Sequence, residues 1–405
     1  MYSAIRLVSE KLNKIAVAFS GIFILIIGFI VTYEVIMRYV FVSPTIWVME
    51  VSIYLNIACV FFAGGFTLRD RMHIRVDTLT CRFSNRNQIL LQLISLILGL
   101  LYCSVLAWKA LELAIMSFRI GEVTPTILHI PVFLSYSCIV FGVSLLMLEF
   151  IVQIMGEILA LRKGGWEGEK TGNWIGRNWP PFAFLILIAF CGALFLSKGL
   201  APIGITALLF VLIFGGMPIA FALGLLGLMG FYLIFGGGPM LAQVPIATFK
   251  VLDDFVVVAL PLFIMLSTIL NIGGIGSKLF EAASNWVRHL PGGLGVATIT
   301  ACAVFAAITG SSSATVATIG LIAIPEMLRR NYEKSFVYGT VAIGGVLGPL
   351  IPPSIFMILI GMISEESIGK LFMAGMLPGF LMATIFSVYI IVRSKRSKAL
   401  ERIKP

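Results

Sequence analysis

The sequence predicts an all-α polytopic membrane protein. Hydrophobic residues make up 59% of its 405 residues and charged residues only 12%, about half the charged share of an average soluble domain. Mean hydropathy is +1.05. Apolar windows recur along almost the whole chain, and several reach the ~20 residues that a helix needs to cross a bilayer. A soluble fold is excluded, because this chain cannot cover its surface with charge.

Apolar segments alternate with short polar loops. We predict membrane segments at about 15–41, 46–68, 88–118, 127–160, 182–197, 202–214, 217–235, 256–272, 294–328, 336–364 and 371–392.

The distribution of basic residues predicts the orientation of these segments. With the N-terminus in the cytoplasm, most of the 29 Lys and Arg fall in cytoplasmic loops, and the outside loops keep only Arg119, Lys198, Lys250 and Lys370. This is the positive-inside pattern of a multi-pass membrane protein. It holds only if 294–328 enters and leaves on the same side, so we predict a re-entrant hairpin there. The net charge of +10 is then explained by cytoplasmic loops, and no nucleic-acid partner is expected.

Composition changes at one place. Residues 162–181 are charged and rich in Gly and Trp, which is typical of a linker. We therefore predict a four-helix unit over 1–161, a linker with a connecting helix over 162–201, and a second unit over 202–405.

The N-terminal unit carries ionisable residues inside its predicted spans. Glu34 and Arg38 are four residues apart, Lys109 and Glu112 are three apart, and Glu50 lies just inside the second span. Residues at these spacings share a helix face. Intramembrane charges are costly and mark functional or packing sites. Because they form no continuous polar path, we interpret these five as structural ion pairs between helices.

The second unit contains a polar cluster between two apolar stretches that are each too short to span. The cluster consists of Thr309, Gly310, Ser311, Ser312, Ser313 and Thr315. Non-helical backbone at membrane depth must be buried in protein or line a cavity. Half-helix N-termini suit an anionic substrate, and unwound carbonyls suit a small cation. The alternative is a Ser/Thr-rich helix-packing seam, although three consecutive serines cannot all face one seam.

The next segment, 336–364, is interrupted at its middle by glycine and proline. The interruption contains Gly344, Gly345, Gly348, Pro349, Pro352, Pro353 and Ser354. Such a density of proline removes backbone donors and opens the helix. A hairpin followed by a discontinuous helix is typical of the substrate and ion site of a secondary transporter.

An enzyme is not expected. A membrane serine hydrolase needs a base beside its nucleophile, and the only histidines, His73, His129 and His289, all fall outside the membrane midplane. No GxxxxGK[ST] motif for ATP is present. The six cysteines form no CxxC pair, so neither a disulfide framework nor a zinc site is expected.

Two sets of motifs resemble the membrane subunits of tripartite ATP-independent periplasmic (TRAP) transporters. The first set resembles the small subunit and consists of RYVF at 38–41, Pro44, Trp47, Glu50, Arg69 and HIRVD at 73–77. The second resembles the large subunit and consists of GGMPIAFALG at 215–224, ALPLFIMLSTILN at 259–271, LPGGLG at 290–295, the TGSSSATVA hairpin and GPLIPPSIFMILIG at 348–361. The chain therefore resembles a fused small and large subunit.

The resemblance implies sodium-coupled import of an organic acid, of sialic acid or C4-dicarboxylate type, by an elevator mechanism. A soluble periplasmic binding protein would deliver the substrate, and the N-terminal unit would be part of the scaffold. Large subunits of the family contain two inverted repeats, whereas this chain holds one hairpin and one broken helix. We therefore expect the large subunit to be truncated after its first repeat.

The coupling ion has an expected site, and no other cofactor is expected. No carboxylate lies in the hairpin tip or the helix break, so Na⁺ would be held by hydroxyls and freed carbonyls of Ser311, Ser312, Ser313, Gly345 and Gly348. Besides substrate and binding protein, the expected partner is membrane lipid. Two alternatives stay open: a binding-protein-independent divalent-anion/sodium symporter, which lacks the unit from RYVF to HIRVD, and a non-transporting membrane scaffold.

Overall fold

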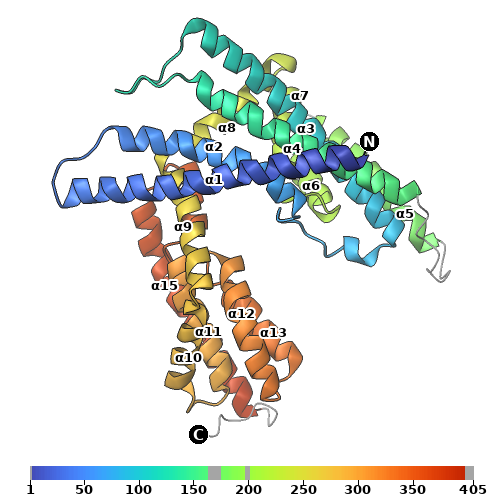
Figure 1. Ribbon diagram of the computed structural model, residues 1–405. Coiled ribbons are helices and arrows are strands. Elements are labelled where there is room, and N and C mark those ends of the chain that lie inside the picture. Colours follow the sequence, from blue (N-terminus) through green and yellow to red (C-terminus); the bar gives the residue numbers. More distant parts are fainter. Residues whose placement is uncertain (1, 163–174, 197–200, 397–405) are drawn as a thin grey trace. The chain divides into compact units, whose positions relative to one another are not determined.

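A computed structural model describes residues 2–162, 175–196 and 201–396 (Figure 1). Over these residues the chain is helical and forms no strand, only an isolated bridge between Val123 and Pro131. Within these described ranges, six helices are long and apolar enough to cross a membrane. The predicted all-α polytopic fold is confirmed. Most of the predicted linker at 162–181 lies outside the described residues.

The chain folds as two compact units, Met1–Asp254 and Phe255–Pro405. Each unit has its own apolar core. Residues 202–254 therefore pack with the N-terminal helices. The predicted boundaries at 161 and 202 concern domain organisation along the sequence and stay a prediction.

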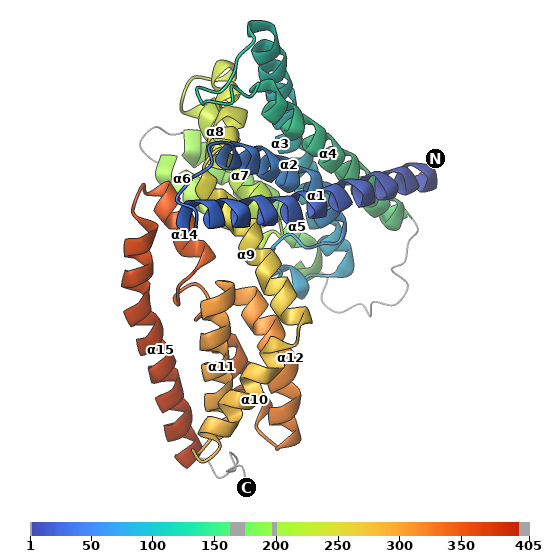
Figure 2. The ribbon, with the colours of Figure 1, turned by 60° about the vertical axis from the view of Figure 1, so that its left-hand side comes forward.

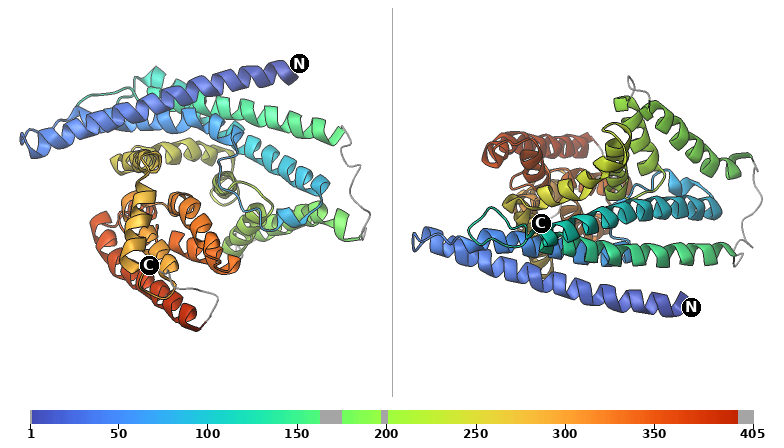
Figure 3. Two further views of the ribbon diagram at one scale, coloured as in Figure 1. Left: turned by 60° about the horizontal axis from the view of Figure 1, so that its bottom comes forward. Right: turned by 90° about the horizontal axis from the view of Figure 1, so that it is seen from above.

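The first unit begins with four long helices, α1 (Tyr2–Tyr39), α2 (Trp47–Arg69), α3 (Asn85–Ile120) and α4 (Phe133–Arg162). Helix α2 packs between α1 and α4, and α3 lies along α4 (Figure 3). The predicted fourth span at 127–160 starts later than expected. Its first residues form a turn instead, because the Thr124 hydroxyl accepts a bond from the Ile130 amide at 3.0 Å and closes the loop before Pro131.

Shorter helices complete this unit: α5 (Ile175–Leu196), α6 (Ala201–Phe214), α7 (Ile219–Leu233), the 3₁₀ turn η2 (Gly238–Ala242) and α8 (Gln243–Leu252). Helices α6 and α7 have 14 and 15 residues, about 21–23 Å of helix. That is less than the ~30 Å of hydrocarbon. Gly216, at φ 85°, forms the turn between them.

The charged residues of the long helices are arranged in local pairs. Arg38 Nη2 lies 2.7 Å from Glu34 Oε1, and the other oxygen of Glu34 accepts bonds from the amide and hydroxyl of Thr45. Lys109 Nζ lies 2.8 Å from Glu112 Oε2. Both pairs lie within one helix, so they stabilise helix turns and do not join neighbouring helices. Glu50, which we grouped with them, forms no ion pair in the described part of the chain, and its Oε2 is buried without a hydrogen-bond partner.

The loop after α2 packs back onto the unit through His73. The imidazole lies 5.0 Å from the ring of Phe221 on α7, edge to face, and its Nε2 is 3.3 Å from the Thr67 hydroxyl. Burial lowers the pKa of His73 below 6.5. A hydrogen bond with the Gly64 backbone raises this pKa, but by a smaller amount. The folded protein therefore prefers the neutral ring.

This preference predicts a pH-dependent stability. Because the unfolded chain takes up the His73 proton first, the free energy of unfolding falls as pH drops through 6.5. In His73→Phe, which keeps the ring contact with Phe221, this part of the loss is expected to disappear. Thermal unfolding in detergent between about pH 8 and about pH 5 measures the effect. An identical pH profile for wild type and variant would contradict it.

The second unit contains α9 (Phe255–Ile272), α10 (Ile275–Val287), α11 (Gly293–Thr309), α12 (Ser312–Arg329), α13 (Lys334–Gly345), α14 (Ile355–Ile363) and α15 (Ile368–Arg396) (Figure 2). Helix α11 is the centre of this unit and contacts α10, α12, α13 and α15. Its Phe305 and Ile299 are fully buried. The core of this unit is therefore built around α11.

One predicted loop of this unit is mostly helical. Residues 273–293, expected as a cytoplasmic loop, contain α10, which packs on α11. Its buried residues Gly276, Phe280 and Ala283 follow the helical spacing of an amphipathic helix. The polar residues between them made the segment too hydrophilic to be predicted as a span. An amphipathic helix explains both the buried apolar residues and the polar residues between them.

Candidate functional site

The predicted hairpin is present as α11 and α12, which turn at Gly310. Gly310 adopts φ 60° and its amide bonds to the Ala306 carbonyl at 2.8 Å, which ends α11. Ser311 is extended, and its hydroxyl accepts from the Ala314 amide at 3.4 Å, which caps α12. A left-handed glycine followed by a serine N-cap reverses a helix within two residues. Whether the hairpin is re-entrant in a membrane stays a prediction.

The predicted discontinuous helix is present as α13 and α14. Helix α13 ends at Gly345 and α14 begins at Ile355, and the residues between them form turns with a cis peptide between Pro352 and Pro353. Because proline has no amide hydrogen, residues 349, 352 and 353 cannot continue the helix. The break thus follows from the local sequence.

The hairpin tip and the helix break are in contact. The Ile355 amide donates to the Gly310 carbonyl at 3.4 Å. A Cβ on Gly348 would lie 2.6 Å from the Ser312 amide nitrogen, and one on Gly310 would lie 2.5 Å from the Pro353 carbonyl oxygen. Only glycine allows the two backbones to approach this closely.

Two further glycines of α13 face the hairpin helices. A Cβ on Gly344 would lie 2.7 Å from Cys302 Sγ on α11, and one on Gly345 would lie 2.1 Å from a Val316 methyl on α12. Sequence reasoning missed Cys302 and Val316. Val316 follows Ser312 by four residues, so helical spacing is a signal that could have indicated it.

Helix α15 forms the opposite wall of the break. A Cβ on Gly375 would lie 2.9 Å from the Leu350 carbonyl oxygen, and one on Gly379 would lie 2.7 Å from Ile351 Cγ1. The break is therefore held between the hairpin tip and two glycines of α15. Our sequence reasoning also missed this wall, because its members are more than twenty residues from the segment they contact.

The hydroxyls of the site differ in their bonding. Ser354 is fully buried, and its Oγ has no hydrogen-bond partner among the described residues. The hydroxyls of Thr309 and Thr315, also fully buried, donate to the carbonyls of Phe305 and Ser311 at 3.0 and 2.8 Å. An unsatisfied buried hydroxyl costs stability. Ser354 is therefore the position where an added ligand would gain most.

The remaining predicted residues lie around this contact. The Ser311 and Ser313 hydroxyls are 3.2 Å apart. Ser313 is exposed, and Ser312 faces the break at Gly345 and Gly348. The site therefore brings Ser311, Ser312 and the glycines together, with Ser313 at its surface.

Four helix ends meet at this contact. The N-termini of α12 and α14 lie together, since the Gly310 carbonyl touches the first amide of α14. The C-termini of α11 and α13 lie beside them, at Gly310 and Gly345. N-termini carry partial positive charge and C-termini partial negative charge. The arrangement thus offers amide donors to an anion and carbonyl oxygens to a cation.

Acidic, histidine and cysteine ligands do not form a metal site: within the described ranges, no group of three or more such side chains is placed to hold one. A cation at the hairpin tip would therefore be bound by neutral oxygens, which are the ligands that hard cations accept.

The helices and the hairpin–break contact define the class, an all-α multi-pass membrane protein. Two family models match it. The DctQ component of tripartite ATP-independent periplasmic transporters matches residues 27–160, and the DctM component matches residues 206–405. The chain belongs to this family and joins its two membrane components in one polypeptide. The family consists of transporter permeases and is not a class of enzymes.

Individual relatives agree with this assignment. The isethionate TRAP transporter permease protein DctMQ of Oleidesulfovibrio alaskensis is 31% identical over 383 residues, which cover 92% of this chain and 57% of the relative. The C4-dicarboxylate TRAP transporter large permease protein DctM of Pseudomonas aeruginosa is 41% identical over 160 residues, 39% of this chain and 38% of the relative. The sialic acid TRAP transporter large permease protein SiaM of Vibrio cholerae is 33% identical over 170 residues, which cover 42% of this chain and 39% of the relative. The chain spans about half the length of the curated relatives it matches.

Proposed function

We propose that this chain is the membrane component of a sodium-coupled, binding-protein-dependent transporter that imports an organic acid across the bacterial inner membrane. A soluble periplasmic protein delivers the substrate. The second unit carries the hairpin–break contact as part of a moving, elevator-like element. The first unit belongs to the scaffold, with its N-terminus in the cytoplasm.

The meeting of four helix ends at Gly310 is the observation that carries this proposal. Amide donors of α12 and α14 suit a carboxylate or sulfonate group, because helix N-termini bind anions. Carbonyls at the ends of α11 and α13 suit Na⁺. A site that binds an anion and a cation side by side couples their transport, since each ion favours binding of the other.

The relatives support an anionic substrate. Their names specify isethionate, C4-dicarboxylates and sialic acid, and each of these molecules carries an acidic group. We propose an organic acid of this kind for this chain, recognised at the N-termini of α12 and α14 through its acidic group.

For the sodium site we propose that the Ser354 hydroxyl joins the neutral ligands at Ser311, Ser312, Ser313, Gly345 and Gly348. Since Ser354 Oγ is buried and unpartnered, Ser354→Ala should leave the melting temperature in KCl unchanged or slightly higher. The same variant should lose part of the rise that wild type shows in NaCl. The expected loss of sodium-dependent stabilisation is about 1–3 kcal/mol for one uncompensated ligand. Each kcal/mol corresponds to about 2–4 °C in melting temperature for a unit of this size.

Ser394→Ala is the matched control. Its hydroxyl is also buried and has no partner in the part of the chain that the structure describes, but it faces Gly292, at the other end of α11. It should keep the full sodium effect. A wild-type protein that melts at the same temperature in Na⁺ and K⁺ has no such site, because binding to the folded state must raise stability.

Transport itself is tested in proteoliposomes of the complete transporter with an inward Na⁺ gradient. Uptake of the organic acid should require both the gradient and the substrate-loaded binding protein. Uptake without the binding protein would favour a divalent-anion/sodium symporter. Absence of uptake together with no sodium stabilisation would favour a non-transporting scaffold.

A further inference from the structure

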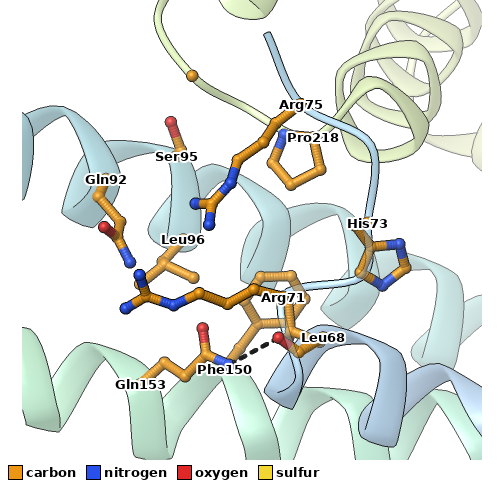
Figure 4. A pocket seen from close by; sticks show the side chains of 11 residues that line it. Leu68, Arg71, His73, Arg75, Gln92, Ser95, Leu96, Phe150, Gln153 and Pro218 are labelled. Carbon is orange, nitrogen blue, oxygen red and sulfur yellow. Dashed lines mark hydrogen bonds between the residues drawn. The ribbon is translucent and has the colours of Figure 1, made fainter. Parts of the chain in front are cut away.

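A basic cavity lies in the first unit, away from the hairpin. It is formed by the loop after α2, the first turns of α3 and the turn between α6 and α7. Its volume is about 260 Å³, and Arg71, Arg75 and Gln92 are among its lining residues. These three also line a small inner pocket of about 30 Å³, which reaches Ser95 and Gln153. Figure 4 shows the Arg71 guanidinium between Gln92 and Gln153, and the Arg75 guanidinium near Ser95 and Leu96 in the same pocket.

The two arginines are only loosely neutralised. Arg71 Nη2 lies 3.8 Å from Glu157 Oε1, and Arg75 Nε lies 3.8 Å from Asp77 Oδ2. The Asp77 side chain is 62% exposed. Charge-assisted hydrogen bonds are shorter, about 2.7–2.9 Å. The guanidinium donors therefore keep capacity for another anion.

A neutral donor adds to this capacity. Ser95 is 5% exposed and is one of the residues that line the inner pocket, and its hydroxyl has no hydrogen-bond partner among the residues that the structure describes. A ligand with several acceptor oxygens would satisfy this hydroxyl and both guanidinium groups. A phosphate group has such oxygens and matches the planar donor pattern of arginine.

An apolar groove adjoins the basic cavity. It has a volume of about 430 Å³ and shares Leu91 and Gly215 with the cavity. Its other lining residues are apolar: Leu79, Phe83, Ala183, Phe184, Leu187, Phe210, Val211 and Phe214. A site with a basic end and a long apolar end fits a molecule with an anionic head and a hydrocarbon chain.

We propose that this composite site binds one anionic phospholipid. The phosphate lies between Arg71 and Arg75, and an acyl chain lies in the groove between α3, α5 and α6. A soluble phosphate would use only the basic end and would leave the groove empty. A bound lipid would stabilise the contact of α5 and α6 with α3, and it would make the stability of this unit depend on the lipid composition of the membrane.

The test measures lipid retention by native mass spectrometry of the full chain in detergent. Phosphatidylglycerol and phosphatidylcholine with identical acyl chains are added in equal amounts. Wild type should retain phosphatidylglycerol preferentially. Removing each arginine charge should reduce the preference about fivefold, so Arg71→Gln/Arg75→Gln should lose up to about twenty-five-fold. Arg86→Gln is the matched control, because Arg86 is exposed on α3 and lines neither cavity.

Cys81 provides a second measurement on the unmodified protein. It lines the basic cavity, and it is the one exposed cysteine of the six. Phosphatidylglycerol should slow its reaction with a maleimide, and inorganic phosphate at the same concentration should not. Ala183→Trp, which fills the groove and keeps both arginines, should abolish this protection.

Each other outcome overturns the proposal. Equal retention of the two lipids in wild type excludes an anion-selective site. Protection of Cys81 by inorganic phosphate alone identifies a soluble-anion site instead. If the double variant does not fold, Cys81 protection in wild type and in Ala183→Trp decides the question.

Discussion

Gly348→Ala is expected to separate the hairpin tip from the helix break and to abolish the sodium-dependent stabilisation. The added methyl would lie 2.6 Å from the Ser312 nitrogen and 2.8 Å from the Ser311 carbonyl carbon. Both atoms belong to the backbone, so the hairpin must shift as a whole. Overpacking of this kind costs about 1–3 kcal/mol. We expect a lower melting temperature in KCl and no further rise in NaCl.

Gly339→Ala is the control for this variant. Gly339 lies on α13, six residues from its end, and a Cβ there would meet nothing within 4 Å. Alanine is the better helix former by about 1 kcal/mol, so this variant should be as stable as wild type or more stable, with the sodium effect intact. If Gly348→Ala kept the full sodium effect, the tip–break contact would not be the ion site.

Gly142→Ala is expected to destabilise the first unit more than any surface change. Gly142 lies on α4 where it crosses α2, and a Cβ there would lie 2.4 Å from the Phe61 carbonyl oxygen and 2.5 Å from its carbon. Because α2 packs against both α1 and α4, moving it disturbs two interfaces. We expect a loss of about 1–3 kcal/mol, measured as a lower melting temperature of the purified protein.

Gly64→Ala on α2 provides the comparison, since a Cβ at Gly64 meets nothing within 4 Å. It should be neutral or slightly stabilising. Equal melting temperatures of Gly142→Ala and Gly64→Ala would show that α2 and α4 do not cross as closely as described.

Much of the site could be predicted from sequence because its causes are local. The serine cluster after Thr309 offers a helix cap, and the closely spaced prolines at 349, 352 and 353 lack the amide donors that would continue a helix. Both interruptions are present in the structure, at Gly310 and between Gly345 and Ile355. Their positions depend on neighbours within a few residues.

The grouping of the charged residues was less successful. Spacing identified the Glu34–Arg38 and Lys109–Glu112 pairs, which the structure contains. Glu50 was grouped with them from its position alone, and in the described part of the chain it forms no ion pair.

What the sequence determined by itself is the class of fold and the positions of its breaks, because hydropathy and helix-breaking residues act through short-range physics. The tertiary structure alone decided which surfaces meet. It placed Gly348 against Ser312, Gly379 against Ile351, and Arg71 with Arg75 beside the groove of α5 and α6. These contacts join segments far apart along the chain. Their geometry depends on close packing of whole helices, which no local pattern of residues specifies.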